Sequence, residues 1–127
     1  MGALPPVSDA ELEVLKILWE HGPGTVRQIE SHLRRRRRRW AYTTVQTLLS
    51  RLREKGCVAS DKGGAAHVFR AAVSRQKLLE SGLCDLAERV CDGTASPLVN
   101  ALVQGVRLSA DDIAHVRKLL DEMAKKE

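Results

Sequence analysis

The sequence predicts a mainly α-helical fold with one small β-hairpin, and three observations lead to this prediction. Apolar residues recur at spacings of three and four in six separate segments, which is the period of an amphipathic helix. Two further segments, residues 57–61 and 66–70, are short and have glycines between them, as in a hairpin. Aromatic residues make up only 3% of the 127 residues, so the core must consist mostly of Leu, Val, Ile and Ala.

The first two helices are predicted from their capping residues and apolar stripes. Ser8 and Glu11 form a capping box at the start of a helix over residues 9–20, and a Gly-Pro-Gly run follows its end. Thr25 is the expected N-cap of the second helix. That helix should fray in the arginine run Arg34–Arg39, because like charges packed this densely repel one another. The apolar stripe of the second helix consists of Val26, Ile29 and Leu33.

The third helix is expected from about Thr43 to the Lys55-Gly56 pair, where Gly56 suits the left-handed conformation that ends many helices. Val45, Leu48, Leu49 and Leu52 recur at core spacing. The opposite face carries short hydrogen-bonding side chains that weaken a helix, so a requirement other than solubility explains them. The residues of this polar face are Thr43, Thr44, Gln46, Thr47, Ser50 and Arg51.

A hairpin is expected after the third helix, with strands over residues 57–61 and 66–70 joined by Lys62-Gly63-Gly64-Ala65. The order of three helices and a hairpin is that of a winged helix-turn-helix domain. We place this domain at residues 1–72.

The remaining residues, 73–127, are predicted to form three helices that pair with a second copy of the chain. Ser74 caps the first of them, Ser96 precedes a proline that opens the second, and Ser109 caps the third. Three short helices alone would expose much apolar surface, and a second copy is the simplest partner. We therefore expect a homodimer. Its predicted interface residues are Leu79, Leu83, Leu86, Val90, Leu98, Leu102, Val116, Leu119 and Leu120.

The excess positive charge lies in the first part of the chain. Residues 1–72 hold 13 Lys/Arg against 7 Asp/Glu, and residues 73–127 hold 8 against 9, within a net charge of +5. This asymmetry indicates a polyanionic partner, with nucleic acid preferred to an anionic membrane. No segment approaches the roughly 18 apolar residues of a membrane span, and the N-terminus lacks the features of a signal peptide. We expect a cytoplasmic protein without membrane insertion.

The polar face of the third helix fits the major groove of double-stranded DNA. Gln pairs with adenine, and Thr offers a hydroxyl and a methyl group to thymine, while basic side chains and helix N-termini hold phosphates. The alternative is that this face is only exposed to solvent. The predicted base-reading residues are Thr43, Thr44, Gln46 and Thr47, and the predicted phosphate contacts are Trp40, Ala41, Ser50, Arg51 and Lys62.

No catalytic, cofactor or metal site is predicted. The four histidines lack metal-ligand spacing, and the three cysteines form no Cys-x-x-Cys pair and are expected to be buried or half-buried thiols. No nucleophile elbow, phosphate-cradling glycine loop or carboxylate cluster occurs, so an enzyme is not expected. Two alternatives to a sequence-specific DNA-binding protein stay open. One is a nonspecific nucleic-acid-binding or architectural protein driven by Arg34–Arg39, and the other is a protein-interaction module that uses the third helix.

The chain resembles the penicillinase repressor (BlaI/MecI) family over nearly its whole length. The likeness is carried by residues 8–15, 18–19, 25–29, 41–52, 55–56, 73–75 and 108–113. The resemblance implies a homodimeric transcriptional repressor that binds two half-sites of a palindromic operator, with the C-terminal helices forming the dimer. It also implies that DNA faces Thr43, Thr44, Gln46, Thr47 and Arg51.

The resemblance also bears on how repression ends. In several members of the family, a membrane-bound sensor metallopeptidase cleaves an Asn-Phe bond in the C-terminal part. The matching positions here are Ala101 and Leu102, with Asn100 one residue earlier, so residues 100–102 are the possible cleavage region. Copper-responsive relatives carry C-terminal Cys-x-Cys pairs, which this chain lacks, and the arginine run is unusual for the family.

Overall fold

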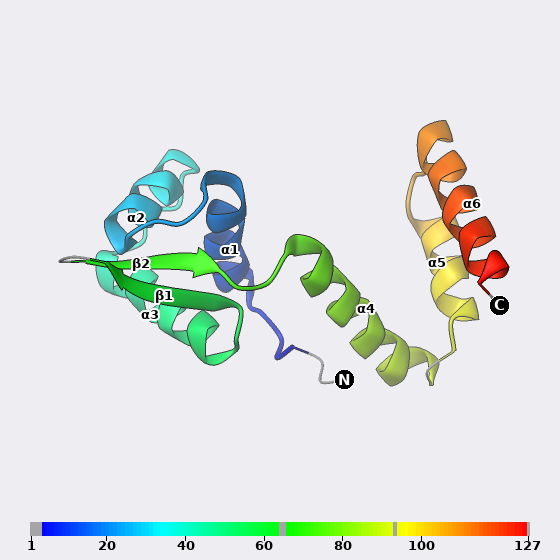
Figure 1. Ribbon diagram of the computed structural model, residues 1–127, viewed down its shortest axis with the longest axis horizontal. Coiled ribbons are helices and arrows are strands. Elements are labelled where there is room, and N and C mark those ends of the chain that lie inside the picture. Colours follow the sequence, from blue (N-terminus) through cyan, green and yellow to red (C-terminus); the bar gives the residue numbers. More distant parts are fainter. Residues whose placement is uncertain (1–3, 64–65, 93, 127) are drawn as a thin grey trace. The chain divides into compact units, whose positions relative to one another are not determined.

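The computed structural model describes residues 4–63, 66–92 and 94–126, and within them the chain forms six helices and a two-stranded sheet (Figure 1). The predicted fold class, mainly α-helical with a small hairpin, is confirmed. Gly64 and Ala65 of the predicted turn lie outside the described residues, as does Gly93 after the fourth helix. The elements are α1 (Asp9–His21), α2 (Val26–Arg35), α3 (Tyr42–Glu54), β1 (Val58–Gly63), β2 (Ala66–Ala71), α4 (Arg75–Cys91), α5 (Ser96–Gly105) and α6 (Ala110–Lys125).

The chain divides into two compact units, Met1–Asp85 and Leu86–Glu127, and the division falls within α4. The domain boundary between residues 72 and 73 stays a prediction. The first unit contains α1, α2, α3 and the hairpin, in the order of a winged helix-turn-helix domain.

Two reciprocal capping boxes fix where α1 and α2 begin. The Ser8 hydroxyl accepts a hydrogen bond from the Glu11 N–H (3.1 Å), and the Ser8 N–H donates to the Glu11 carboxylate (2.8 Å). Thr25 and Gln28 make the same pair of hydrogen bonds, 3.2 and 2.8 Å long, at α2. Local sequence therefore sets both helix starts, because side chains satisfy backbone N–H groups that have no partner within the helix.

The core of the first unit lies where α1, α2 and α3 pack together against the hairpin. The predicted apolar stripes of α2 and α3 are buried, and the predicted Gly56 adopts the left-handed conformation (φ +79°). The core residues are Val14, Leu15, Ile17, Leu18, Val26, Ile29, Leu33, Val45, Leu48, Leu49, Leu52, Cys57, Val58, Phe69 and Val73.

The two strands pair antiparallel, with the register running from Val58 opposite Ala71 to Gly63 opposite Ala66. Each strand is longer at its C-terminal end than predicted, and Cys57 is not part of β1. The Cys57 N–H instead donates to the Leu52 carbonyl (2.9 Å) and so completes the turn that ends α3.

The hairpin is also tied to the loop between α1 and α2. Gly24 and Phe69 exchange two backbone hydrogen bonds, 3.0 and 2.8 Å long, as a third strand would. These bonds hold β2 beside the start of α2.

The helices that follow the hairpin have no buried side chain among the described residues of α4, α5 and α6. Many of their apolar side chains are exposed in the single chain, including Leu79, Leu83, Val116 and Leu119. An amphipathic helix normally buries its apolar stripe, so these helices lack a partner surface.

The cysteines are only partly as predicted. Cys57 is buried and Cys91 half-buried, but Cys84 is exposed, so the prediction of a buried or half-buried thiol is wrong there. Among the described residues, no helix combines the length and the apolar composition that crossing a bilayer requires.

Candidate nucleic-acid interface

The polar face of α3 is exposed because buried residues on its opposite face hold the helix against the core. Val45, Leu49 and Leu52 are fully buried, and Leu48 is nearly so. Because a helix turns by about 100° per residue, this anchor directs the intervening side chains away from the core. The side chains of Thr43, Thr44, Gln46, Thr47 and Arg51 are exposed.

One group of these residues lines a shallow hollow of about 280 Å³. Thr43, Thr44, Thr47 and Arg51 meet there, above Leu48. The Thr47 hydroxyl donates a hydrogen bond to the Thr43 carbonyl (2.9 Å), so its proton is engaged within the helix. Thr47 can therefore offer an incoming group its methyl group and its oxygen lone pairs.

Gln46 lies apart from that group and lines a second hollow of about 270 Å³. Its neighbours there come from the first turn of α2, the first turn of α3 and the β2 strand. The Gln46 amide makes no hydrogen bond within the described part of the chain, so both its donor and its acceptor are available. The other lining residues are Thr25, Val26, Arg27, Tyr42, Ala66, His67 and Phe69.

Four polar residues of the second hollow were not predicted as site residues: Thr25, Arg27, Tyr42 and His67. The Arg27 guanidinium lies 5.4 Å from the centre of the Tyr42 ring, a cation–π contact between α2 and α3. His67 lies on β2, with its ring 6.4 Å from that of Phe69. Residues 27 and 67 come from different elements, so helical periodicity in α3 gave no signal for them.

The predicted phosphate contacts are spread over α3 and the hairpin. Ala41 is the N-cap of α3 and provides no side-chain cap, so the first backbone N–H groups of α3 point outward unsatisfied by a side chain. Trp40 is half-buried against the core, and Ser50 is half-buried as well. Lys62 is exposed on β1, opposite His67 in the hairpin register. Thus both predicted cations, Arg51 and Lys62, have exposed side chains.

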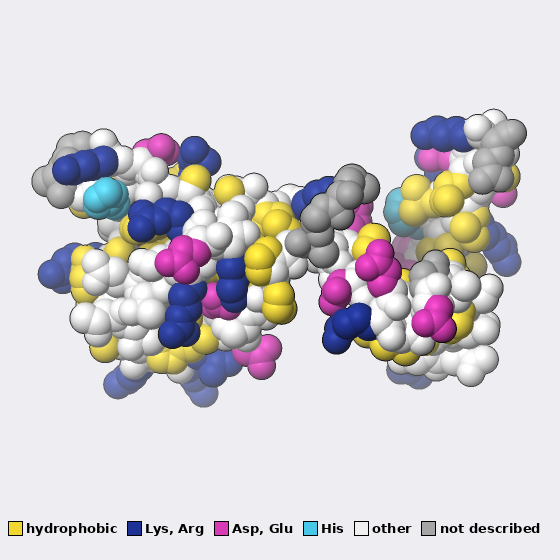
Figure 2. All heavy atoms as spheres, turned by 90° about the horizontal axis from the view of Figure 1, so that it is seen from below, with side chains coloured by type: hydrophobic (Ala, Val, Ile, Leu, Met, Phe, Trp, Pro, Cys, Tyr) yellow, Lys and Arg dark blue, Asp and Glu magenta, His cyan; other side chains and the backbone are white. Residues whose placement is uncertain are grey.

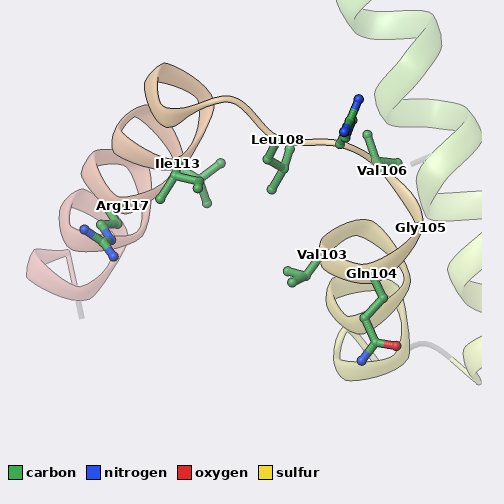
Figure 3. Close-up of a pocket in the computed structure, with 9 residues that line it drawn as sticks. Val103, Gln104, Gly105, Val106, Leu108, Ile113 and Arg117 are labelled. Carbon is green, nitrogen blue, oxygen red and sulfur yellow. The ribbon is translucent and has the colours of Figure 1, made fainter.

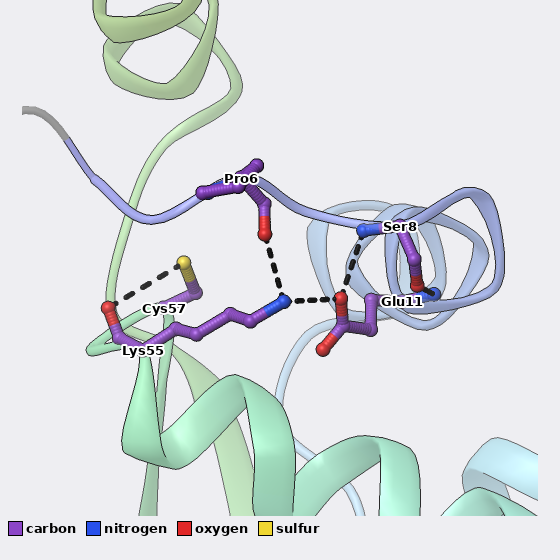
Figure 4. Close-up of polar contacts among 5 residues, drawn as sticks. All are labelled: Pro6, Ser8, Glu11, Lys55 and Cys57. Atoms are coloured by element: carbon purple, nitrogen blue, oxygen red, sulfur yellow. Dashed lines mark hydrogen bonds and ion pairs between the residues drawn. The ribbon is translucent and has the colours of Figure 1, made fainter.

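The C-terminal end of α3 is fixed by a buried ion pair (Figure 4). The Nζ of Lys55, at the C-cap, lies 2.6 Å from Oε1 of Glu11 and donates a second hydrogen bond to the Pro6 carbonyl (2.7 Å). Burial alone would raise the pKa of Glu11, but hydrogen bonds from Lys55 and Ser8 outweigh it and hold the pKa below its ordinary value. The carboxylate is therefore charged and keeps α3 attached to α1.

A second contact joins α3 to the hairpin. Nη1 of Arg53 donates to the Ser60 hydroxyl on β1 at 3.1 Å. Across the strands, Nε of Arg70 lies 3.1 Å from the Asp61 carboxylate. The first contact orients the hairpin against α3 and the second holds the two strands in register, and because both are exposed, neither contributes much to stability.

The charge on this unit is mixed rather than uniform. Figure 2 shows Lys and Arg side chains at several places around the first unit, with acidic side chains between some of them. Glu30 and Glu20 pair with Arg34 (3.5 Å) and Arg36 (3.9 Å), which lowers the effective charge of the arginine run. The exposed face of α3 itself carries no acidic residue before Glu54.

The histidines form no metal cluster among the described residues. His21 and His32 instead stack with their ring centres 3.7 Å apart, between the ends of α1 and α2. Burial lowers the pKa of His32, and the nearby His21 and Arg35 lower it further. This pair is a packing contact, away from the polar face of α3 in the chain.

Comparisons with known proteins identify the family of the chain. The penicillinase repressor family model matches residues 7–122. A penicillinase repressor of Bacillus licheniformis is 29% identical over 122 residues, 96% of this chain and 94% of the relative. The transcriptional regulator BlaI of Mycobacterium tuberculosis is 33% identical over 125 residues, 97% of this chain and 88% of the relative.

Two solved structures resemble a part of the chain. One is the DNA-binding domain of the repressor BlaI, with a TM-score of 0.52. The other is the monomeric form of Bacillus licheniformis BlaI in complex with the blaP half-operator, with a TM-score of 0.51. Each is 32% identical and covers 61% of this chain and 93% of the solved chain. Together with the family match, they show that this chain belongs to the penicillinase repressor family of transcriptional repressors, which are not enzymes.

Proposed function

We propose that this chain represses transcription by binding a palindromic DNA operator as a homodimer, with one α3 helix in the major groove of each half-site. The polar face of α3 carries the proposal, because it combines exposed Thr and Gln side chains with an absence of acidic residues before Glu54. Bacillus licheniformis BlaI, which is 32% identical over 61% of this chain, was solved in complex with the blaP half-operator, and this likeness supports operator DNA as the partner. A protein that acts on DNA in this way is expected in the cytoplasm.

In this proposal the two hollows of α3 have different roles. Thr43, Thr44 and Thr47 read base edges beside Arg51, which holds a phosphate. Gln46 reads an adenine from the second hollow, where its free amide can make two hydrogen bonds. Phosphates also meet the uncapped N-terminus of α3 after Trp40 and Ala41, the Ser50 hydroxyl and the Lys62 ammonium on the hairpin.

The dimer is proposed from the apolar surface of α4, α5 and α6. All nine predicted interface residues are exposed or half-exposed in the single chain. None of them belongs to the buried core, which lies in the first unit. Figure 3 shows Val103, Leu108 and Ile113 facing the space between α5 and α6, which forms a hollow of about 660 Å³. A second chain that fills this surface would bury it, and burial is worth roughly 25 cal/mol for each Å² of apolar area.

Proteolytic relief is the remaining part of the proposal. Asn100, Ala101 and Leu102 are exposed but lie within α5, so a membrane-bound sensor metallopeptidase would have to unwind part of this helix to reach the backbone. A cut there would separate α6 from the DNA-binding unit and weaken the dimer. Co-expressing the chain with a sensor peptidase and mapping the cleavage product by mass spectrometry tests this step.

Fluorescence anisotropy tests the central proposal. The probes are a duplex from the region upstream of the chain's own gene and a shuffled duplex of equal composition. We expect a preference of about 10³ or more for the first duplex, with two chains bound per duplex. Equally tight binding to both probes would instead support a nonspecific architectural protein driven by the arginine run, and no salt-dependent binding would support a protein-interaction module.

A further inference from the structure

Six consecutive arginines, Arg34–Arg39, span the end of α2 and the connection to α3, and all six are exposed. α2 ends at Arg35, within the run, as like-charge repulsion predicts. Figure 1 shows this connection leading from the end of α2 to the start of α3. Only Trp40 and Ala41 separate Arg39 from the first residue of α3.

The arginine run is held in a defined turn rather than left as a loose connection. The Arg36 and Arg38 N–H groups both donate to the Leu33 carbonyl, at 3.0 and 2.9 Å, and the Arg37 N–H donates to the Arg34 carbonyl at 3.1 Å. This pattern closes the end of a helix, and Leu33 is fully buried. The turn is therefore anchored to the core.

Arg37 occupies a backbone position where glycine is favoured. Its φ is +64°, in the left-handed region. For a residue with a Cβ atom this conformation costs roughly 1–2 kcal/mol, and helix ends of this type usually carry Gly or Asn there. At the end of α3 the corresponding left-handed position is occupied by a glycine, Gly56, at φ +79°. An arginine at position 37 thus adds charge at the expense of backbone stability.

Part of the run is neutralised within the protein and part is not. Arg34 and Arg36 pair with acidic residues of α2 and α1. Arg37, Arg38 and Arg39 have no acidic partner within the described part of the chain. Three adjacent unpaired guanidinium groups repel one another, and a regular row of negative charges would relieve that repulsion.

We propose that Arg37, Arg38 and Arg39 bind the phosphate backbone of DNA next to the base pairs that α3 reads. The inference rests on the proposed function, because it is the short connection to α3 that brings these side chains to DNA. Four residues span at most about 14 Å, so Arg37 lies within that distance of Ala41 at the N-cap of α3. Phosphate contacts carry no base information, so these arginines raise affinity for all sequences.

The salt dependence of binding tests this proposal. We compare the wild-type chain with a triple variant, Arg37→Gln, Arg38→Gln and Arg39→Gln, on the upstream and shuffled duplexes. The slope of log K against log salt is negative, and each lost phosphate contact reduces its magnitude, the salt slope, by about 0.9, so three reduce it by about 2.7 per chain. Between 50 and 200 mM salt, the loss of affinity should then be smaller in the variant than in the wild type by a factor of roughly 40 for each bound chain.

A charge-matched control uses Lys118→Gln, Lys125→Gln and Lys126→Gln, which lie at exposed positions in or after α6. This control should leave the slope close to that of the wild type. An equal slope change in the two triple variants would overturn the proposal. If the wild-type chain itself shows no preference for the upstream duplex, the proposed function fails instead, so the two failures are distinguishable.

Arg37→Gly provides a second test that separates charge from folding. Glycine suits the left-handed backbone, so this variant should melt at a higher temperature than the wild type. It should nevertheless bind both duplexes more weakly, with a salt slope lower by about 0.9 per chain. A higher melting temperature together with an unchanged salt slope would contradict a role for Arg37 in binding DNA.

Discussion

The Nζ of Lys55 lies 2.6 Å from Oε1 of Glu11, and this contact joins the end of α3 to the first turn of α1 across 44 residues of sequence. Glu11 is only 1% exposed, and it is the buried charged residue of the described core. Its second carboxylate oxygen, Oε2, has no hydrogen-bond partner within the described structure. The buried carboxylate therefore depends on Lys55 and on the Ser8 N–H for its stabilisation.

Replacing Lys55 by methionine should destabilise the first unit strongly. Removing one partner of a buried pair leaves an uncompensated charge, which costs about 3–5 kcal/mol when both partners are fully buried. The Lys55 side chain is 27% exposed, so water offsets part of this loss. We expect Lys55→Met to lower the free energy of unfolding by about 2–3 kcal/mol, measured by urea denaturation.

The matched control is Lys16→Met, which breaks the longer, half-buried Lys16–Glu13 pair (3.6 Å) on α1. That change should cost about 1 kcal/mol or less, because both groups remain in contact with water. Adding Glu11→Gln to Lys55→Met should restore part of the stability, because the unpaired charge is then gone. Equal losses for the two single lysine variants would contradict a special role for the buried pair.

The same pair predicts how stability depends on pH. The pKa of Glu11 is lowered in the folded chain, since the hydrogen bonds from Lys55 and Ser8 outweigh the effect of burial. A carboxyl group with a lowered folded pKa contributes stability above its unfolded pKa, near 4.5, and loses it as the pH falls through the folded pKa. The free energy of unfolding of the wild type should therefore decrease between pH 5 and pH 3.

Glu11→Gln isolates this effect from the other carboxyl groups. Asp112, whose pKa is lowered by its hydrogen bonds to Ser109, remains in both proteins. The quantity to compare is the slope of unfolding free energy with pH, because the variant also changes the absolute stability. Urea titrations at several pH values should give a shallower acid decrease for Glu11→Gln, and parallel curves would show that Glu11 does not carry the dependence.

The contrast between local and distant contacts explains what the sequence could predict of the fold. Ser8 and Glu11 are three residues apart, so their capping box follows from spacing alone. Lys55 is remote from both, and no periodicity places its ammonium beside Glu11. The left-handed backbone conformation of Arg37 could not be predicted either, because the glycine that usually marks such a position is missing there.

The candidate site shows the same division. The exposed face of α3 follows from helical periodicity, and Thr43, Thr44, Thr47 and Arg51 do share one hollow. The second hollow around Gln46 could not be predicted, since it requires α2 and β2 to lie beside the start of α3. The backbone bonds between Gly24 and Phe69 that bring them there join residues 45 positions apart.

Gln46→Ala should reduce binding to the operator duplex by about 1–3 kcal/mol, because a bidentate base contact is lost. Binding to the shuffled duplex should hardly change. Thr47→Ala should act in the same direction through loss of its methyl and hydroxyl groups. Anisotropy titrations on both duplexes measure the two affinities.

Arg51→Ala is the contrasting variant, since its side chain is assigned to a phosphate in the first hollow. It should weaken binding to both duplexes alike and lower the salt slope by about 0.9 per chain. If Gln46→Ala instead reduced the affinity for both duplexes equally, Gln46 would not read a base.

Leu83→Lys together with Leu86→Lys should convert the proposed dimer into monomers. Both side chains lie on the apolar stripe of α4 and are about two-fifths exposed in the single chain, so lysine can be accommodated without a cavity in the core. Two ammonium groups facing their symmetry mates would be desolvated and repel one another across the interface.

The control, Cys84→Lys with Glu88→Gln, adds the same charge on the opposite side of α4, as the helical period of 3.6 residues places it. Light scattering should show a halved mass for the leucine variant and the wild-type mass for the control, whereas a dimer that survives the leucine changes would place the interface away from this stripe.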